Sequence, residues 1–250
     1  MKKSFSRIIT LTERNVKEIV RDPLSLIFII ALPLVMEILF YYIFHNLTEQ
    51  FRMKYLAPGI IVFSQSFITL FIGMLIATDR STSFLTRLFV TKTRASEFIL
   101  SYLFSVLPIV FTQGILFYLV GGIIDVTLFG TGMLFSFLLS FVTSFLFIGF
   151  GILLGSLCNE RSIGGVSSLI IAGQSVLSGM WFPTEGLNKN IITAMSVLPF
   201  KNATALVQNA LNGIKDVWSD FALPFIIIVA YTTVIFFIAI LIFKRKMKSR

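Results

Sequence analysis

One acidic side chain lies inside the first long apolar segment of the sequence: Glu37, in the stretch ALPLVMEILFYY. If residues 24–45 cross a bilayer as one helix, the midpoint falls between Leu34 and Val35, and Glu37 lies roughly 4 Å from it at 1.5 Å per residue. A carboxylate at that depth costs on the order of 3 kcal/mol unless it is protonated, paired or facing water. Two interpretations stay open: a functional site, and a protonated acid hydrogen-bonded between helices. Pro33, one turn earlier, removes a helix hydrogen bond and predicts a kink.

The other residues with chemistry to offer are few. Gln113, Gln174, Ser175 and Ser178 are the remaining polar groups predicted at depth, and with Glu37 they would line a pathway. The sequence contains no G-x-x-x-x-G-K-[ST] phosphate loop and no H-E-x-x-H motif, and it has one histidine and one cysteine. We therefore expect no ATP hydrolysis by this chain alone, no catalytic residue, no metal site and no disulfide within one chain.

The composition indicates which elements position these residues. The chain is 56% hydrophobic and 13% charged, with a mean hydropathy of +0.91, whereas soluble domains are about 25% charged. A bilayer crossing needs about 20 consecutive apolar residues, and six segments qualify. The sequence thus predicts an all-α integral membrane protein, a single domain over residues 1–250, with transmembrane helices at about 24–45, 56–78, 99–124, 133–157, 163–182 and 223–243.

The basic residues fall mainly on one side of these spans. Sixteen of the 21 lysines and arginines lie in the N-terminal segment, the loop between the second and third spans, the short loop after the fourth span and the C-terminal tail. The positive-inside rule then predicts that both termini are cytoplasmic. Because topology explains the charge of +9, we expect a lipid bilayer as partner and no nucleic acid.

Three segments outside the spans have recognisable patterns. Residues 1–22 carry apolar residues at i, i+3, i+4 spacing and predict a cytoplasmic amphipathic helix lying in the membrane interface, ended by Asp22-Pro23. Residues 183–222 hold two short apolar pieces and predict two re-entrant helices at the outer side. The loop 79–97 has two interpretations, an interfacial helix or a docking element for a cytoplasmic partner, and composition alone favours the first.

Four stretches, in their order and spacing, resemble the membrane subunits of ATP-binding-cassette type-2 exporters, the ABC-2 permeases. They are YLAPGI at 55–60, RLFVTKTRASEFILSYLF at 87–104, SGMWFPTEGL at 178–187 and LPFKNATALVQNALNG at 198–213. With the amphipathic N-terminal helix, the resemblance covers the whole chain. The chain departs from the family pattern at Lys92, where many members have proline, and near Asn188, where many have a second one.

The resemblance implies a half-transporter that forms a homodimer and works with two copies of a separate cytoplasmic ATPase, which binds ATP and Mg. It implies that the 79–97 loop is a coupling helix, which reverses the preference from composition. The residues that would dock in the ATPase are Phe84, Leu85, Arg87, Leu88 and Phe89. The first, second and fifth spans would line the route, with Glu37, Gln174 and Ser178 in it. The outer gate would include Trp181, Phe182, Pro183 and Glu185.

The expected function is ATP-driven export of a drug, antibiotic or lipid-like amphipath across a bacterial plasma membrane, and hence multidrug or antibiotic resistance. The alternative is a secondary transporter driven by an ion gradient, with Glu37 as its proton or cation site. That mechanism expects inverted repeats and paired interrupted helices, and the sequence shows neither clearly. An intramembrane enzyme such as a lipid transferase needs clustered His, Asp or Glu near an interface, and the sequence offers none.

Overall fold

The fold is built from helices alone in the part of the chain that the structure describes. The structure is a computed structural model, and it describes residues 2–82, 94–182 and 186–248. Helices make up 88% of it, and these residues contain no strand. The prediction of an all-α membrane protein is confirmed.

Five helical segments are long and apolar enough to cross a membrane, and they overlap five of the six predicted spans. The first comprises α2 (Pro23–Leu26), the π-helix η1 (Ile27–Ala31) and α3 (Leu32–Phe44). The next three are α4 (Met53–Ser81), α6 (Ala95–Ile124) and α7 (Thr131–Leu157). The last begins as the π-helix η4 (Val217–Ala222) and continues as α11 (Leu223–Lys248).

The sixth predicted span, 163–182, corresponds to α8 (Glu160–Leu177), which is not among these five segments. Sequence reasoning placed the end of this helix at Pro183, and that prediction is wrong because the helix ends at Leu177. Gly179 follows with φ 72°, the left-handed conformation that glycine adopts freely and that commonly ends helices. A membrane crossing by this segment stays a prediction.

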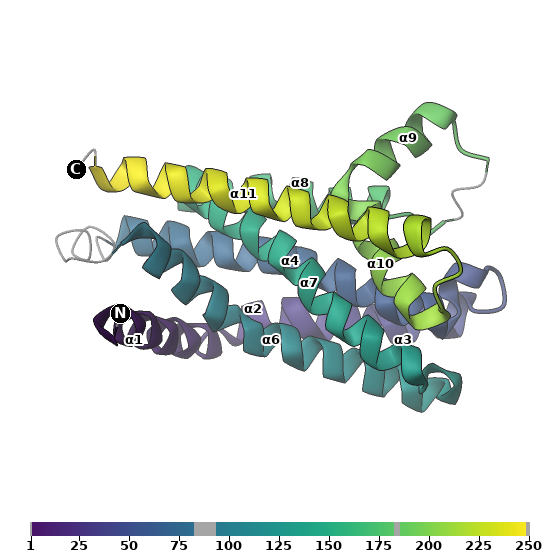
Figure 1. Cartoon of the computed structure of the whole chain (residues 1–250). Helices are drawn as coiled ribbons and strands as arrows, with labels where there is room; N and C mark the ends of the chain where they lie inside the picture. Colours follow the sequence, from purple (N-terminus) through teal and green to yellow (C-terminus); the bar gives the residue numbers. More distant parts are fainter. Residues whose placement is uncertain (1, 83–93, 183–185, 249–250) are drawn as a thin grey trace.

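The helices form an elongated bundle with two distinct ends (Figure 1). At one end, here called the α1 end, lie α1 (Lys2–Val20), the start of α6 and the last turns of α4, α7 and α11. At the other, here called the α10 end, lie α9 (Lys189–Val197) and α10 (Pro199–Asn212), with the 3-10 turns η2 (Glu49–Phe51) and η3 (Val126–Leu128). The first and last helices therefore have their terminal ends on the same side.

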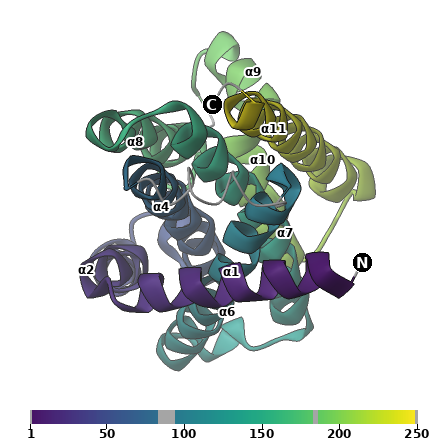
Figure 2. The ribbon, with the colours of Figure 1, turned by 90° about the vertical axis from the view of Figure 1, so that its left-hand side faces the viewer.

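The N-terminal helix α1 lies across the end of the bundle and not along it, as Figure 2 shows. It packs mainly against α6, burying Asn15 and Ile19 while Phe5 on another face stays 66% exposed. The predicted stop is present: α1 ends at Val20, and Asp22 caps the next helix by accepting a hydrogen bond from the backbone N–H of Ser25. Pro23 occupies the first helical position, where its missing N–H costs nothing.

The central helix is α4, which packs against α3, α6, α7, α8 and α10. Its closest neighbour is α7, because glycines let the two backbones approach. A Cβ added at Gly151 would lie 3.0 Å from the carbonyl oxygen of Thr69, and one added at Gly155 would lie 2.8 Å from that of Gly73. The Gly151 and Gly155 pair thus acts as a small-xxx-small seam.

The segment between α8 and α11 contains two short helices, as the sequence predicts. They differ in packing: α10 lies against α4, α7 and α11, whereas α9 has Met195 as its buried residue. Their insertion into a membrane leaflet stays a prediction. Helix α10 itself is held between the first turns of α4 and of the last span.

Candidate functional site

Glu37 is fully buried on α3, and neither carboxyl oxygen has a hydrogen-bond partner among the described residues. It faces α6 at a point where that helix has no side chain, since a Cβ on Gly121 would lie 3.0 Å from Glu37 Oε1. The same point is 3.2 Å from Met53 Sδ, at the first residue of α4. Glu37 therefore lies beside the last turn of α6 and the first residue of α4, and its depth in the bilayer stays a prediction. A carboxyl group buried without a partner is costly, which keeps it a candidate functional residue.

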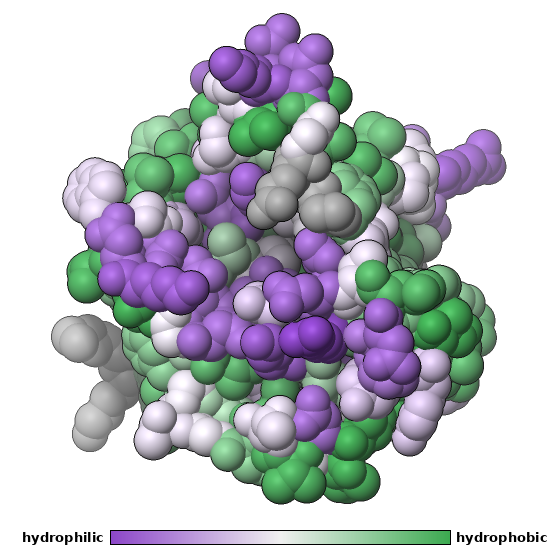
Figure 3. Space-filling view, turned by 90° about the vertical axis from the view of Figure 1, so that its right-hand side faces the viewer, coloured by the Kyte–Doolittle hydropathy of each residue, from purple (hydrophilic) through white to green (hydrophobic). Residues whose placement is uncertain are grey.

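A polar hollow opens at the α10 end, one helical turn beyond Glu37. It has a volume of about 420 Å³. Its lining comes from the end of α3 and the turn after it, from the start of α4 and from the turn after α6: Tyr41, His45, Asn46, Arg52, Lys54, Asp125 and Thr127. Tyr41 follows Glu37 by four residues on α3, and Asp125 follows Gly121 by four, so both continue the same faces. Figure 3 shows that hydrophilic residues gather across the middle of this end, with hydrophobic ones around them.

The regular α-helix of the first span is interrupted just before Pro33 by the π-helix η1, and the kink predicted at Pro33 stays a prediction. In η1 the N–H of Leu32 reaches back five residues to the carbonyl of Ile27. An α-helical residue 33 would donate to the carbonyl of Ile29, but proline has no N–H. The side chain of Gln113 on α6 donates to that carbonyl, since its Nε2 lies 3.0 Å from Ile29 O and both residues are buried. Gln113 thus holds the interrupted turn of the first span against α6.

The same chemistry recurs where α10 meets α4. Pro58 cannot donate to the carbonyl of Lys54, and Asn212 Nδ2 donates to that oxygen at 2.9 Å. One turn away on α10, Gln208 Nε2 donates to the next carbonyl, that of Tyr55, at 2.8 Å. The proline of the YLAPGI stretch and the amides of the LVQNALNG stretch therefore form one structural unit.

The last span repeats the arrangement. Pro224 leaves the carbonyl of Asp220 without its α-helical donor, and Asn209 Nδ2 on α10 donates to it at 3.0 Å. Helix α10 therefore binds the proline turns of two spans at once. From the sequence these amides are recognised only as part of a family-like stretch, although three amides within five residues, in a chain whose predicted spans begin close to prolines, were a usable signal.

The predicted gate and pathway residues lie in two different surroundings. Gln174 and Ser178 are buried, and Gln174 Nε2 donates to Thr204 Oγ1 of α10 at 2.9 Å. Glu37 lies instead against Gly121 on α6. The structure thus brings Gln174 to α10, and among the described hydrogen bonds none links it to Glu37.

Trp181 follows α8 in a turn and connects three parts of the bundle. Its ring packs edge-to-face with Phe40 of α3 at 5.0 Å and with Phe63 of α4 at 5.6 Å, measured between centroids, and it stacks with Phe51 of η2 at 6.3 Å. Its Nε1 donates to Ser175 Oγ at 3.1 Å. Phe182 beside it is half-buried. Pro183 and Glu185 lie outside the described residues, as do all five predicted docking residues, 84, 85 and 87–89.

An ion pair between a half-buried arginine and a buried aspartate joins α1 to α4 at the α1 end. Arg14 donates to both carboxylate oxygens of Asp79, at 2.6 and 2.5 Å, and Tyr102 of α6 donates to the same carboxylate at 2.6 Å. Burial lowers the pKa of the Arg14 guanidinium, but its hydrogen bonds and charge attraction to Asp79 and its attraction to Glu18 outweigh burial and raise that pKa. Sequence reasoning missed this cluster, although an aspartate at the end of an apolar span was a usable signal.

Arg80, which follows Asp79 on α4, joins that helix to α7. Its guanidinium donates to the carbonyl oxygens of Gly155, Ser156 and Cys158 at 2.7 to 3.0 Å. These carbonyls end α7, where a cation is favourable because the helix dipole is negative there. The last turn of α4 is therefore tied to α1 and α6 on one side and to α7 on the other.

Comparison with known families agrees with this architecture. Residues 6–212 match the family model described as ABC-2 type transporter. The chain belongs to the ABC-2 type transporter family. It is therefore a multi-pass membrane protein with a permease role, and the family implies partnership with an ATPase subunit. No curated protein matches the chain. Among the described residues, no group of three or more His, Cys, Asp or Glu side chains is placed to hold a metal ion.

Proposed function

We propose that this ABC-2 permease is the membrane half of an ATP-driven exporter that moves a drug, antibiotic or lipid-like amphipath out of a bacterial cell, and so contributes to resistance. In the complete assembly, two copies of the chain bind two copies of a cytoplasmic ATPase, which holds ATP and Mg, and the chain hydrolyses no nucleotide itself. The α1 end faces the cytoplasm of the cell. The observation that carries the proposal is the family match over residues 6–212.

The proposal assigns α4 the task of carrying motion from the ATPase to the outer side. This helix has 29 residues and is about 44 Å long at 1.5 Å per residue, so it reaches from one end of the bundle to the other. Its last turn, at Asp79 and Arg80, is tied to α1, α6 and α7. The segment predicted to dock in the ATPase follows directly in sequence. A push on that segment would therefore move the end of α4 together with its neighbours.

At the other end, the first turn of α4 is tied to the proposed gate. The carbonyls of Lys54 and Tyr55 are held by α10, and Phe63 packs on Trp181. Movement of α4 would thus shift α10 and the aromatic cluster around Trp181 together. Packed elements of this kind move as units because tightly packed interiors deform little.

The docking part of the proposal is tested with the chain coexpressed with its ATPase. Changing Phe84, Leu88 and Phe89 to glutamine should abolish co-purification of the ATPase and ATP-dependent dye export from membrane vesicles. The matched control, Ile191→Gln, changes an exposed residue of α9 at the opposite end. It should leave co-purification and dye export unchanged. The proposal fails if the docking variant binds and exports normally, or if the purified chain exports alone.

A second candidate function, an ion-gradient transporter, is favoured by one observation. Glu37 is buried without a hydrogen-bond partner beneath a polar hollow that contains His45 and Asp125, an arrangement suited to proton or cation exchange. The test is Glu37→Gln, which removes the titratable carboxyl group. If the variant retains full transport and an unchanged pH dependence, Glu37 is structural and this candidate is eliminated.

A further inference from the structure

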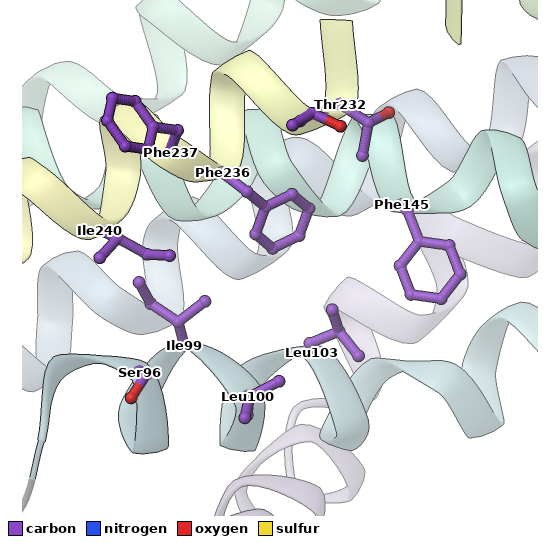
Figure 4. Close-up of a pocket in the computed structure, with 10 residues that line it drawn as sticks. Ser96, Ile99, Leu100, Leu103, Phe145, Thr232, Phe236, Phe237 and Ile240 are labelled. Atoms are coloured by element: carbon purple, nitrogen blue, oxygen red, sulfur yellow. The ribbon is translucent and has the colours of Figure 1, made fainter. Parts of the chain in front are cut away.

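An apolar groove with a volume of about 560 Å³ runs along the outside of the bundle at the α1 end. One wall is α6, the other is α11, and Phe145 of α7 lies at its inner end (Figure 4). Its volume is within the range of about 300–1,000 Å³ that is usual for small-ligand sites. Apart from Ser96, Thr232 and Thr233, the lining residues are hydrocarbon or aromatic: Ile99, Leu100, Leu103, Phe145, Phe236, Phe237 and Ile240.

The groove has a polar end and an apolar interior. Ser96 lies in the first turn of α6, two residues after Arg94, and Ile240 is followed one turn later on α11 by Lys244 and Arg245. Arg94, Lys244 and Arg245 are exposed. The nearby carboxylate of Glu97 is turned away, since it accepts from Ser4 and pairs with Arg7 on α1. The charge beside the groove mouth is therefore positive.

The depth of the groove matches one leaflet of a bilayer. From Lys244 to Thr232 the helix rises about 18 Å, at 1.5 Å per residue, and half of a hydrocarbon core is about 15 Å thick. At the deep end, the Thr232 hydroxyl is buried without a hydrogen-bond partner among the described residues. A molecule with an anionic head and an apolar tail of leaflet length fits both the charge and the dimensions.

We propose that this groove binds one anionic phospholipid of the leaflet at the α1 end, with an acyl chain between α6 and α11 and the phosphate near Arg94, Lys244 and Arg245. The family match does not assign such a site, and the inference holds whether or not the chain is an exporter. Each basic side chain at a membrane surface contributes about fivefold in affinity for anionic lipid. The occupied groove would hold the free face of α11 against α6.

Native mass spectrometry tests the proposal on the purified chain, taken from vesicles of equal parts dioleoylphosphatidylglycerol and dioleoylphosphatidylcholine. The wild type should retain one phosphatidylglycerol in preference to phosphatidylcholine. The double variant Lys244→Gln, Arg245→Gln should lower that retention about fivefold for each charge removed, with phosphatidylcholine unchanged. Lys189→Gln, Lys215→Gln at the other end is the charge control and should behave as wild type.

A second variant tests the acyl-chain position. Leu100→Trp fills the groove and should reduce retention of both lipids, whereas Leu119→Trp, also exposed on α6 but outside the groove, should change nothing. Equal retention of the two lipids by the wild type would overturn the proposal, as would equal behaviour of the two tryptophan variants. Disulfide crosslinking of two chains through Phe237→Cys, in a Cys158→Ser background, would show a second copy in the groove and would also overturn it.

Discussion

The buried contact between Gln113 and the proline turn of the first span yields a prediction that is quantitative. In the wild type, removing Gln113 takes away a donor that residue 33 cannot replace, because Pro33 has no N–H to offer the carbonyl of Ile29. In a Pro33→Ala background, the new N–H of residue 33 takes over that carbonyl, so Gln113 is no longer needed there. The two substitutions must therefore be coupled.

The magnitude follows from the cost of an unpaired buried carbonyl, about 1–3 kcal/mol, and from the smaller values of up to about 1.7 kcal/mol measured between membrane helices. We expect a coupling energy of about 1–1.5 kcal/mol. The single change Gln113→Leu is a poor measure, since it also removes Gln113 Oε1, which is buried without a partner. In the double-mutant cycle that contribution occurs in both backgrounds and cancels.

The assay is reversible unfolding in mixed micelles with increasing dodecyl sulfate, for the wild type, Gln113→Leu, Pro33→Ala and the double variant. A cycle of Gln113→Leu with Pro108→Ala is the matched control, because the carbonyl affected by Pro108 is that of Phe104, which Gln113 does not contact. Additive free energies in the Pro33 cycle, within about 0.5 kcal/mol, would refute the reasoning.

Three more predictions concern other parts of the bundle. Gly155→Leu should lower the free energy of unfolding in the same assay by at least about 2 kcal/mol, since its Cβ would meet the backbone of α4. Gly164→Leu, which has open space around it, should be nearly neutral. Similar costs for the two variants would refute the role of the small-xxx-small seam. Arg14→Leu should cost about 2 kcal/mol and speed proteolysis within α1, because it leaves a buried aspartate without its cation. Unchanged proteolysis would show that the ion pair does not hold α1. Hydrogen bonds from the Ser219 hydroxyl and from the backbone N–H groups of Trp218 and Ser219 lower the pKa of Asp216. The contribution of Asp216 to stability is therefore complete above its ordinary pKa and is lost as the pH falls through the lower pKa of the folded state. Trp218 fluorescence should therefore change below about pH 4, and a transition that persists in Asp216→Asn would rule this out.

The sequence allowed prediction of the spans that are dominated by apolar residues. Helices such as α4 and α7 follow from length and hydropathy alone, because a bilayer imposes both. The exception is α8, whose glycines and serines dilute its apolar pattern, and whose end is set by Ser178 and the left-handed Gly179 rather than by Pro183.

Contacts between segments distant in sequence could not be predicted in this way. Glu37 was identified from its cost in lipid, but its position beside Gly121 depends on how α3 and α6 pack. The pairing of Asn212 with the proline turn at Pro58 joins residues more than 150 positions apart in sequence. Periodicity reports which face of one helix is apolar, and it contains no information about which partner completes an interrupted turn in another.

The central claim is that ATP, through a partner, drives transport by this permease. The direct measurement uses proteoliposomes that contain the chain with its ATPase and a panel of amphipathic dyes and fluorescent phospholipids. For any probe that the complex moves, we predict movement on addition of Mg-ATP without an ion gradient, and none with the chain alone. Movement by the chain alone, driven by a proton or sodium gradient without ATP, would contradict the account.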